Sequence, residues 1–223
     1  MMAWLALTCA AYLAALWLFR RSGQHLLLLP VLTGTALLLL ALNLSGVSYP
    51  AYAEATRLLR WLTGPAIIAL AVPLYRQARQ LRRLAWSVLV ALLTGCLLSV
   101  LGTLVVGWLL DAPLPFTLSL STKAATMPMA MQAAERAGGV AAIAAMAVVA
   151  TGVLGTLMAE TLFRWLNVTD VRARSFALGL VAHAIGVVRV LQTQPEQLAF
   201  AALAMGLNGI GTALVLAVLT GWL

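Results

Sequence analysis

The only lysine of this chain, Lys123, lies in a mostly apolar stretch that reads LSLSTKAATMPMAM over residues 118–131. A lysine at the centre of a membrane span costs about 2.5–3.5 kcal/mol on insertion scales, so an intramembrane lysine is a functional hypothesis. Its hydroxyl-bearing neighbours can hydrogen-bond a carboxylate or line water; they are Ser119, Ser121, Thr122 and Thr126. We predict that Lys123 and these hydroxyls bind an anion. The alternative is a lysine that snorkels to the membrane interface.

Three further polar side chains lie within apolar segments and join the candidate substrate-binding set. His183 titrates near neutral pH and is the candidate proton carrier, although a lone histidine among apolar residues also serves as a packing residue. Arg189 is either a second anion contact or the anchor of its helix. For Asn208, hydrogen bonding between helices is the favoured role.

Interrupted helices are expected around these residues. Proline removes an amide donor and restricts the residue before it, and Pro65, Pro73, Pro128 and Gly186 mark the expected breaks. A broken helix exposes unpaired N–H groups that favour anions. Irregular backbone at membrane depth survives only where protein or a water-filled cavity satisfies its polar groups.

The composition explains why helices must hold these residues in a bilayer. Of 223 residues, 63% are hydrophobic and 9% are charged, against about 25% charged in an average globular domain. A mean hydropathy of +1.02 excludes a soluble core of this size. We therefore predict an all-α integral membrane protein, forming one transmembrane domain over residues 1–223 and using the lipid bilayer as its solvent.

The same residues argue against several other classes of protein. Cys9 and Cys96 lie in apolar runs without the spacing of metal ligands, so no metal and no cofactor is expected. No nucleophile elbow, metalloprotease motif or phosphate-binding loop occurs in the sequence, and we predict that the protein is not an enzyme. The net charge of +8 does not indicate nucleic-acid binding, because the arginines gather at the ends of apolar runs.

About seven to eight membrane segments are predicted, at roughly 3–19, 26–44, 61–75, 84–110, 114–134, 139–164, 173–190 and 198–222. The first is interpreted as a retained span, because no cleavage site follows it. Arginines at 20–21, 76–83 and 164–174 are typical of cytoplasmic loops. The arginines at 164–174 lie on the cytoplasmic side only if segment 114–134 is re-entrant or broken near Lys123. Arg57 and Arg60 fall on the opposite side in that topology.

An inverted repeat follows from this topology. Segments 26–110 and 139–222 then run in opposite senses with three spans each, and weak internal halves are expected at about 1–112 and 113–223. Residues 64–76 and 177–189 are similar in length, in small residues and in their terminal arginine. Paired interrupted segments in two halves indicate the midplane site of a transporter, although membrane helices tolerate proline and glycine without such a site.

Four stretches together resemble the LrgB/CidB family: GPAIIALAVPLYRQ (64–77), LSTKAATMPMAM (120–131), ERAGGVAAIAA (135–145) and ALGLVAHAIGVVRV (177–190). The resemblance covers almost the whole chain and keeps the order of the landmarks. The chain departs from the family pattern at Thr122, where proline is usual, and at Ala124, where serine is usual. These departures affect the expected substrate more than the expected class of protein.

The resemblance implies two functions. Members of the family are described as holin-like or antiholin-like proteins tied to murein hydrolase export and autolysis, while relatives include the plastid glycolate/glycerate translocator and bacterial proteins associated with pyruvate uptake. We expect a secondary transporter of small monocarboxylates, with protons as the candidate coupling ion. The antiholin-like regulator is the alternative. The expected setting is the bacterial cytoplasmic (inner) membrane, with a homo-oligomer (dimer) and an LrgA/CidA-type membrane partner.

Overall fold

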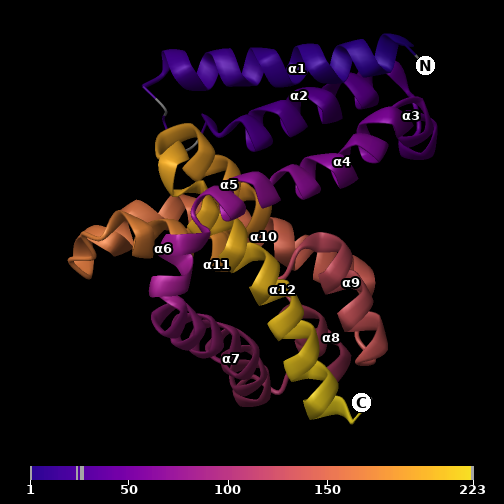
Figure 1. The fold of residues 1–223 in the computed structure, drawn as a ribbon. Coiled ribbons are helices and arrows are strands. Elements are labelled where there is room, and N and C mark those ends of the chain that lie inside the picture. The colour runs from indigo at the N-terminus through magenta and orange to yellow at the C-terminus, as the bar shows by residue number, and fades with distance from the viewer. Residues whose placement is uncertain (1, 24, 26–27, 222–223) are drawn as a thin grey trace. The chain divides into compact units, whose positions relative to one another are not determined.

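The structure, a computed structural model, describes residues 2–23, 25 and 28–221 (Figure 1). Its regular elements are helices, and no strand occurs among these residues. The predicted all-α class is therefore confirmed for the described part of the chain. Contacts divide the chain into two compact units, Met1–Ala71 and Val72–Leu223. The single transmembrane domain with weak halves at about 1–112 and 113–223 stays a prediction, and so does the inverted repeat.

The first unit holds four helices: α1 (Met2–Arg21), α2 (Pro30–Ser45), α3 (Tyr49–Ala55) and α4 (Arg57–Ala69). Helix α1 packs along α2 and touches α3. The chain bends by 117° between α2 and α3, where Gly46 ends α2 with a positive φ of 65° that glycine adopts without strain. The Tyr52 hydroxyl lies 3.1 Å from the Thr8 hydroxyl, and its ring meets that of Trp4 edge to face.

Pro65 does not interrupt its helix, and the break comes later, at Leu70. Pro65 lies inside α4, which continues to Ala69, and α5 (Ala71–Arg76) begins after Leu70. In a continuous helix the Ala69 carbonyl would accept from the residue at position 73, which is a proline without an N–H. Pro73 therefore explains the break between α4 and α5. Pro65 is accommodated within the helix.

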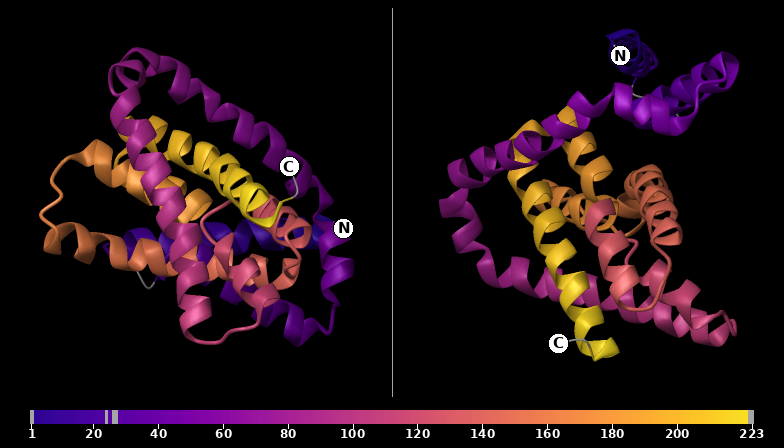
Figure 2. Two further views of the ribbon diagram at one scale, coloured as in Figure 1. Left: turned by 90° about the horizontal axis from the view of Figure 1, so that it is seen from below. Right: turned by 90° about the vertical axis from the view of Figure 1, so that its right-hand side faces the viewer.

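In the second unit, pairs of short helices alternate with single long helices, beginning with α5 and α6 (Figures 1 and 2). After α6 (Ala78–Arg83) come α7 (Ala85–Leu109), α8 (Leu114–Ser121), α9 (Met127–Arg136) and α10 (Ala141–Trp165). The chain ends with α11 (Val171–Thr193), the 3-10 turn η2 (Pro195–Gln197) and α12 (Leu198–Thr220). Helix α12 contacts α7, α9 and α11, and its buried face is rich in alanine, which allows close approach.

Five helices among the described residues are long and apolar enough to cross a bilayer: α1, α7, α10, α11 and α12 with η2. The number rises to six if α2 and α3 form one bent span. Helix α10, with 25 residues, extends about 37 Å, more than the roughly 30 Å of a bilayer's hydrocarbon core. The chain is thus a multi-pass membrane protein, with fewer candidate spans than the seven to eight predicted.

The predicted segments agree with the helices in position. Each of them overlaps one helix or a pair of short helices. Residues 26, 27 and 222, at the edges of the predicted segments 26–44 and 198–222, lie outside the described residues. The difference in count comes from the short segments, because the region 61–75 forms α4 and α5 and the region 114–134 forms α8 and α9.

Helices α8 and α9 double back on each other. They are separated by residues 122–126, and α9 begins with Pro128 in its first turn, the position where a missing N–H is tolerated. The Val140 amide donates to the Ser119 hydroxyl at 2.7 Å, across 21 residues of sequence. The chain after α9 therefore returns to α8, and the predicted break near Lys123 is present as a turn between two half-helices.

Helix α11 also folds back on itself. Its backbone is non-helical at His183, with φ 40° and ψ −126°. Ser175 donates to the Gln194 side chain at 3.3 Å although 19 residues separate them; a straight helix would hold them about 28 Å apart. Helix α11 is therefore a hairpin of two arms joined at His183, and its length alone does not make it a span. The interruption is at His183 rather than at the predicted Gly186.

Candidate functional site

The two hairpins meet at Asn208, a fully buried residue of α12. Its amide Nδ2 donates to the Ala124 carbonyl at 2.8 Å and to the Leu180 carbonyl at 3.0 Å. Ala124 lies in the turn between α8 and α9, and Leu180 lies in the first arm of α11. One side chain therefore joins the two interrupted segments.

The breaks themselves explain why these two carbonyls need an outside donor. In a regular helix the Ala124 carbonyl would bond to residue 128, and Pro128 has no N–H. The donor for Leu180 would be Ala184, which follows the non-helical His183. An unsatisfied carbonyl inside a membrane protein is costly. Asn208 therefore makes hydrogen bonds between segments, the kind of role that the sequence favoured, and its partners are carbonyls at helix breaks.

His183 holds the bend of α11 against α10. A non-glycine residue at positive φ is strained, and such residues cluster at functional sites. Its Nε2 lies 2.9 Å from the Val148 carbonyl; a carbonyl only accepts, so Nε2 is the donor and carries the proton. Gly152 leaves room for the imidazole, because a Cβ there would lie 2.6 Å from Cε1. His183 as a whole is 3% exposed.

Lys123 points toward α7 from the turn between α8 and α9. Its Nζ donates to the Ser99 carbonyl at 3.1 Å and to the Thr103 hydroxyl. None of the ion pairs found among the described residues involves Lys123. The ammonium is therefore solvated by neutral oxygens, and its charge is not balanced by a neighbouring carboxylate in this part of the chain.

A cavity of about 650 Å³ opens beside Lys123, between α7, α8 and α10. This volume lies within the usual range for small-molecule sites. Four hydroxyl residues share the lining with Lys123, and the rest is apolar; they are Ser99, Thr103, Thr117 and Thr151. An anion with a small apolar body fits a cavity of this composition.

The hydroxyl residues predicted around Lys123 are mostly occupied elsewhere. Ser119, Ser121 and Thr122 are fully buried and donate to carbonyls within their own segment, at 2.6–2.8 Å. Thr126 is the N-cap residue of α9 and makes no side-chain cap hydrogen bond. Lys123 is the one predicted site residue that lines the cavity. The binding role of the others stays a prediction.

Arg189 lies apart from the cavity, on the second arm of α11. It is within electrostatic range of Glu160 near the end of α10, and Arg174 on the first arm forms an ion pair with the same carboxylate. Glu160 therefore interacts with both arms of the hairpin, by an ion pair with Arg174 and by its charge with Arg189. The choice between an anion contact and a helix anchor for Arg189 stays open.

The arginine groups of two predicted loops meet at one end of the second unit. A pocket of about 470 Å³ is lined by Arg172 together with residues of α5, α6 and the turns that flank α6: Arg76, Gln77, Arg79, Gln80, Arg83 and Leu84. Gln77 also donates to the Glu196 carbonyl of η2. The region 76–83, the start of α11 and η2 therefore lie close together, while the cytoplasmic location expected for 76–83 and 172–174 stays a prediction.

Sequence reasoning missed Ser99, Thr103, Thr117 and Thr151. The first two lie one turn apart on α7, which reads as an ordinary apolar span. Small hydroxyl residues are common in membrane helices, so their types alone carry little signal. The part of the chain that the structure describes holds no cluster of three or more histidine, cysteine or acidic residues suited to a metal ion.

The fold and the site define a multi-pass membrane protein with two interrupted, doubled-back segments. The sequence profile of the LrgB-like family matches residues 8–222, and the chain belongs to that family. An uncharacterized protein of Bacillus subtilis (strain 168), YxaC, is 32% identical over 186 residues, covering 83% of this chain and 80% of the relative. No solved structure matches the chain significantly.

Other relatives carry a descriptive name. The antiholin-like protein LrgB of Bacillus cereus (strain B4264) is 27% identical over 206 residues, which is 92% of this chain and 90% of the relative. The protein of the same name in Bacillus anthracis (strain CDC 684 / NRRL 3495) has the same identity and coverage. The family resemblance inferred from the four sequence landmarks is thereby confirmed.

Proposed function

We propose that this protein is a secondary transporter of small monocarboxylates, of the pyruvate, lactate, glycolate and glycerate class, in the bacterial cytoplasmic membrane. The observation that carries the proposal is Lys123, whose ammonium borders a cavity at a helix break and is solvated only by Ser99 and Thr103 oxygens among the described residues. A charged side chain within a membrane segment is expected to mark a substrate or ion pathway.

The two hairpins support a transport mechanism. Discontinuous helices whose breaks lie close together are the usual binding element of secondary transporters, with their irregular backbone lining the substrate path. Here the α8–α9 turn and the α11 bend share Asn208. In the proposed mechanism the carboxylate binds Lys123, and one hairpin then moves relative to α10 and α12 to open the cavity to the other side.

A proton is the proposed coupling ion. A monocarboxylate that moves with one proton crosses without net charge, and histidine is the side chain that titrates nearest neutral pH. His183 is the candidate carrier, on the opposite hairpin from Lys123. His183 is not among the residues that line the cavity beside Lys123, so the proposed coupling acts through the bend at His183 and its bond to Val148.

Counterflow in proteoliposomes tests the proposal. Purified protein should exchange radiolabelled pyruvate, lactate, glycolate or glycerate above the rate of empty liposomes. Lys123→Gln should abolish saturable uptake, because it keeps the length of the side chain but removes the charge, and Lys123→Arg should retain part of it. Uptake by Lys123→Gln with wild-type rate and affinity for each acid would refute the site.

A second function is favoured by the names of the relatives, which are called antiholin-like. In that interpretation the protein regulates murein hydrolase export, as a homo-oligomer or with an LrgA/CidA-type partner, and its polar residues line a subunit interface. Passage of large solutes through the same proteoliposomes, with no exchange of the four acids, would favour the regulator over the carrier.

A further inference from the structure

The arginine pocket at the end of the second unit is open and strongly cationic. Arg76, Arg79 and Arg83 are exposed and Arg172 is half-buried. No acidic residue lines this pocket among the described residues. The neighbouring Asp170 pairs with Arg172, at 2.6 Å between carboxylate and guanidinium. Three arginines around the pocket therefore offer charge that this carboxylate does not balance.

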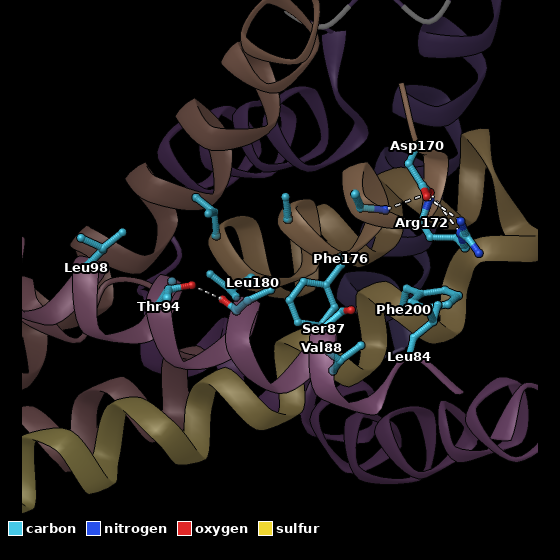
Figure 3. A pocket seen from close by; sticks show the side chains of 15 residues that line it. Leu84, Ser87, Val88, Thr94, Leu98, Asp170, Arg172, Phe176, Leu180 and Phe200 are labelled. Carbon is cyan, nitrogen blue, oxygen red and sulfur yellow. Dashed lines mark hydrogen bonds and ion pairs between the residues drawn. The ribbon is translucent and has the colours of Figure 1, made fainter. Parts of the chain in front are cut away.

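An apolar crevice continues from the arginine pocket along α7. It has a volume of about 520 Å³ and lies between α7, the first arm of α11 and Phe200 of α12 (Figure 3). Leu84 and Arg172 line both the pocket and the crevice. Figure 3 shows Asp170 and Arg172 at one end of the crevice, and Thr94 and Leu98 at the other. A cationic mouth and an apolar body thus form one continuous surface.

The crevice is long enough to hold an acyl chain through one leaflet of a bilayer. Its lining on α7 runs from Leu84 to Leu98, about 21 Å along a helix, against roughly 15 Å for half of a bilayer's hydrocarbon core. The Thr94 hydroxyl is satisfied by the Val90 carbonyl of its own helix at 2.8 Å. Phe176, Leu180 and Phe200 line the crevice and belong to a buried hydrophobic core cluster.

Exposed aromatic residues place the arginine pocket at the membrane interface. Tyr75, Trp86 and Trp165 are 85%, 77% and 77% exposed. They lie beside Arg76, beside α6 and at the end of α10, near the arginine groups. Tyrosine and tryptophan concentrate at the level of lipid headgroups.

We propose that the arginine pocket and the crevice together bind one anionic phospholipid, with its phosphate among Arg76, Arg79, Arg83 and Arg172 and one acyl chain along α7. Guanidinium groups bind phosphate oxygens in bidentate geometry, and basic pockets between helices on the cytoplasmic side are suited to anionic headgroups. The lipid would then hold α7 against the first arm of α11. This site is separate from the Lys123 cavity and does not depend on the transport proposal.

Native mass spectrometry of the purified full-length protein tests the lipid site. Phosphatidylglycerol should bind more tightly than phosphatidylcholine of the same acyl chains. The double variant Arg79→Gln/Arg83→Gln should reduce that preference about thirtyfold, because each near-surface arginine contributes about 1 kcal/mol and 1.4 kcal/mol is a factor of ten. The control Arg82→Gln/Arg164→Gln removes the same charge outside the pocket and should leave the preference within threefold.

A second pair of variants distinguishes a lipid from a free phosphate. Ala91→Phe fills the crevice and should weaken phosphatidylglycerol binding, while Val105→Phe, exposed on α7 outside the crevice, should not. Circular dichroism confirms that each variant is folded. Equal binding of both lipids to the wild type would overturn the proposal. So would phosphatidylglycerol binding that inorganic phosphate displaces and Ala91→Phe leaves unchanged, or a change of oligomeric state in Ala91→Phe without a change in lipid binding.

Discussion

The side-chain amide of Asn208 donates hydrogen bonds to two backbone carbonyls that lie at helix breaks. Both Nδ2 protons are used, one on the Ala124 carbonyl and one on the Leu180 carbonyl. Its Oδ1 is buried and has no hydrogen-bond partner among the described residues. The residue therefore contributes as a double donor. Because each carbonyl belongs to a different hairpin, its loss affects both breaks at once.

Asn208→Leu tests this role. We expect a loss of about 1–3 kcal/mol in the free energy of unfolding, because two buried carbonyls lose their donor. Unfolding in sodium dodecyl sulfate, followed by circular dichroism, measures the change. Thr156→Val is the matched control, since the buried Thr156 hydroxyl donates only to Gly152 of its own helix. A loss in Asn208→Leu no larger than in Thr156→Val would contradict the role.

At the scale of elements, the α11 hairpin depends on close approach of its two arms. A Cβ at Gly186 would overlap the Leu178 carbonyl, eight residues earlier, so only glycine fits while the arms are closed. A Cβ at Gly206 on α12 would meet no atom within 4 Å apart from its own stretch of helix. Gly186 is needed for packing, whereas Gly206 only carries the general cost of glycine in a helix. Comparing substitutions at the two positions separates these effects.

Gly186→Ala should destabilise the protein by about 1–3 kcal/mol, because the added methyl separates the arms or shifts the backbone. Gly206→Ala should be neutral or stabilising by about 0.5–1 kcal/mol, because alanine is the better helix former. The same detergent unfolding assay measures both. Equal effects of the two substitutions would show that α11 is not folded back at this position.

Asp170 starts the first arm of α11 as its N-cap. Its carboxylate accepts from the Arg172 amide at 2.8 Å and the Ala173 amide at 3.4 Å. The Arg172 side chain, followed by these amides, lowers the pKa of Asp170 to about 2. A carboxyl with a depressed folded pKa stabilises the fold above its ordinary pKa near 3.8 and loses that contribution as the pH falls toward 2.

Asp170→Ala should cost about 1 kcal/mol at neutral pH through loss of the cap. Asp170→Asn should keep most of the cap, because asparagine is an equally good N-cap residue, and should lose only the ion pair with Arg172. Stability measured between pH 5 and pH 2 should fall less steeply in both variants than in the wild type. An unchanged acid profile in Asp170→Asn would show that this carboxylate does not titrate in the expected range.

At the scale of the whole molecule, the hairpin in α11 changes the topology that its length suggests. Helix α11 passes the test for a membrane span by length and composition, yet Ser175 and Gln194 near its two ends are hydrogen-bonded. If both ends lie on one side, the regions 76–83, 170–175 and 194–197 share that side. The proposal places them in the cytoplasm, in agreement with the positive-inside rule.

Single cysteines at Gln80, Ala173 and Glu196 should show the same accessibility to a membrane-impermeant thiol reagent in intact cells. The background replaces Cys9 and Cys96 by alanine. All three should be protected until the membrane is permeabilised, while a cysteine at Asp111, at the other end of α7, should react from outside. Opposite labelling of positions 173 and 196 would show that α11 crosses the membrane.

Much of this architecture was predictable from the sequence, because bilayer burial needs long apolar runs and proline removes a helix donor. Those rules located α7, α10 and α12 and the break before Pro128. They also singled out Lys123, since a lone cation in an apolar run has few structural explanations. The four landmark stretches identified the family, which the profile match confirms.

The tertiary structure alone decided what the interrupted segments do. The bend at His183 lies in a run with the length and hydropathy of an ordinary span, and a positive φ at a histidine arises from packing against Val148 and Gly152 rather than from local preference. Likewise, Ser99 and Thr103 reach Lys123 only because α8 packs on α7. Local rules encode where a helix can break, whereas the partner of each freed group depends on contacts between residues far apart in the chain.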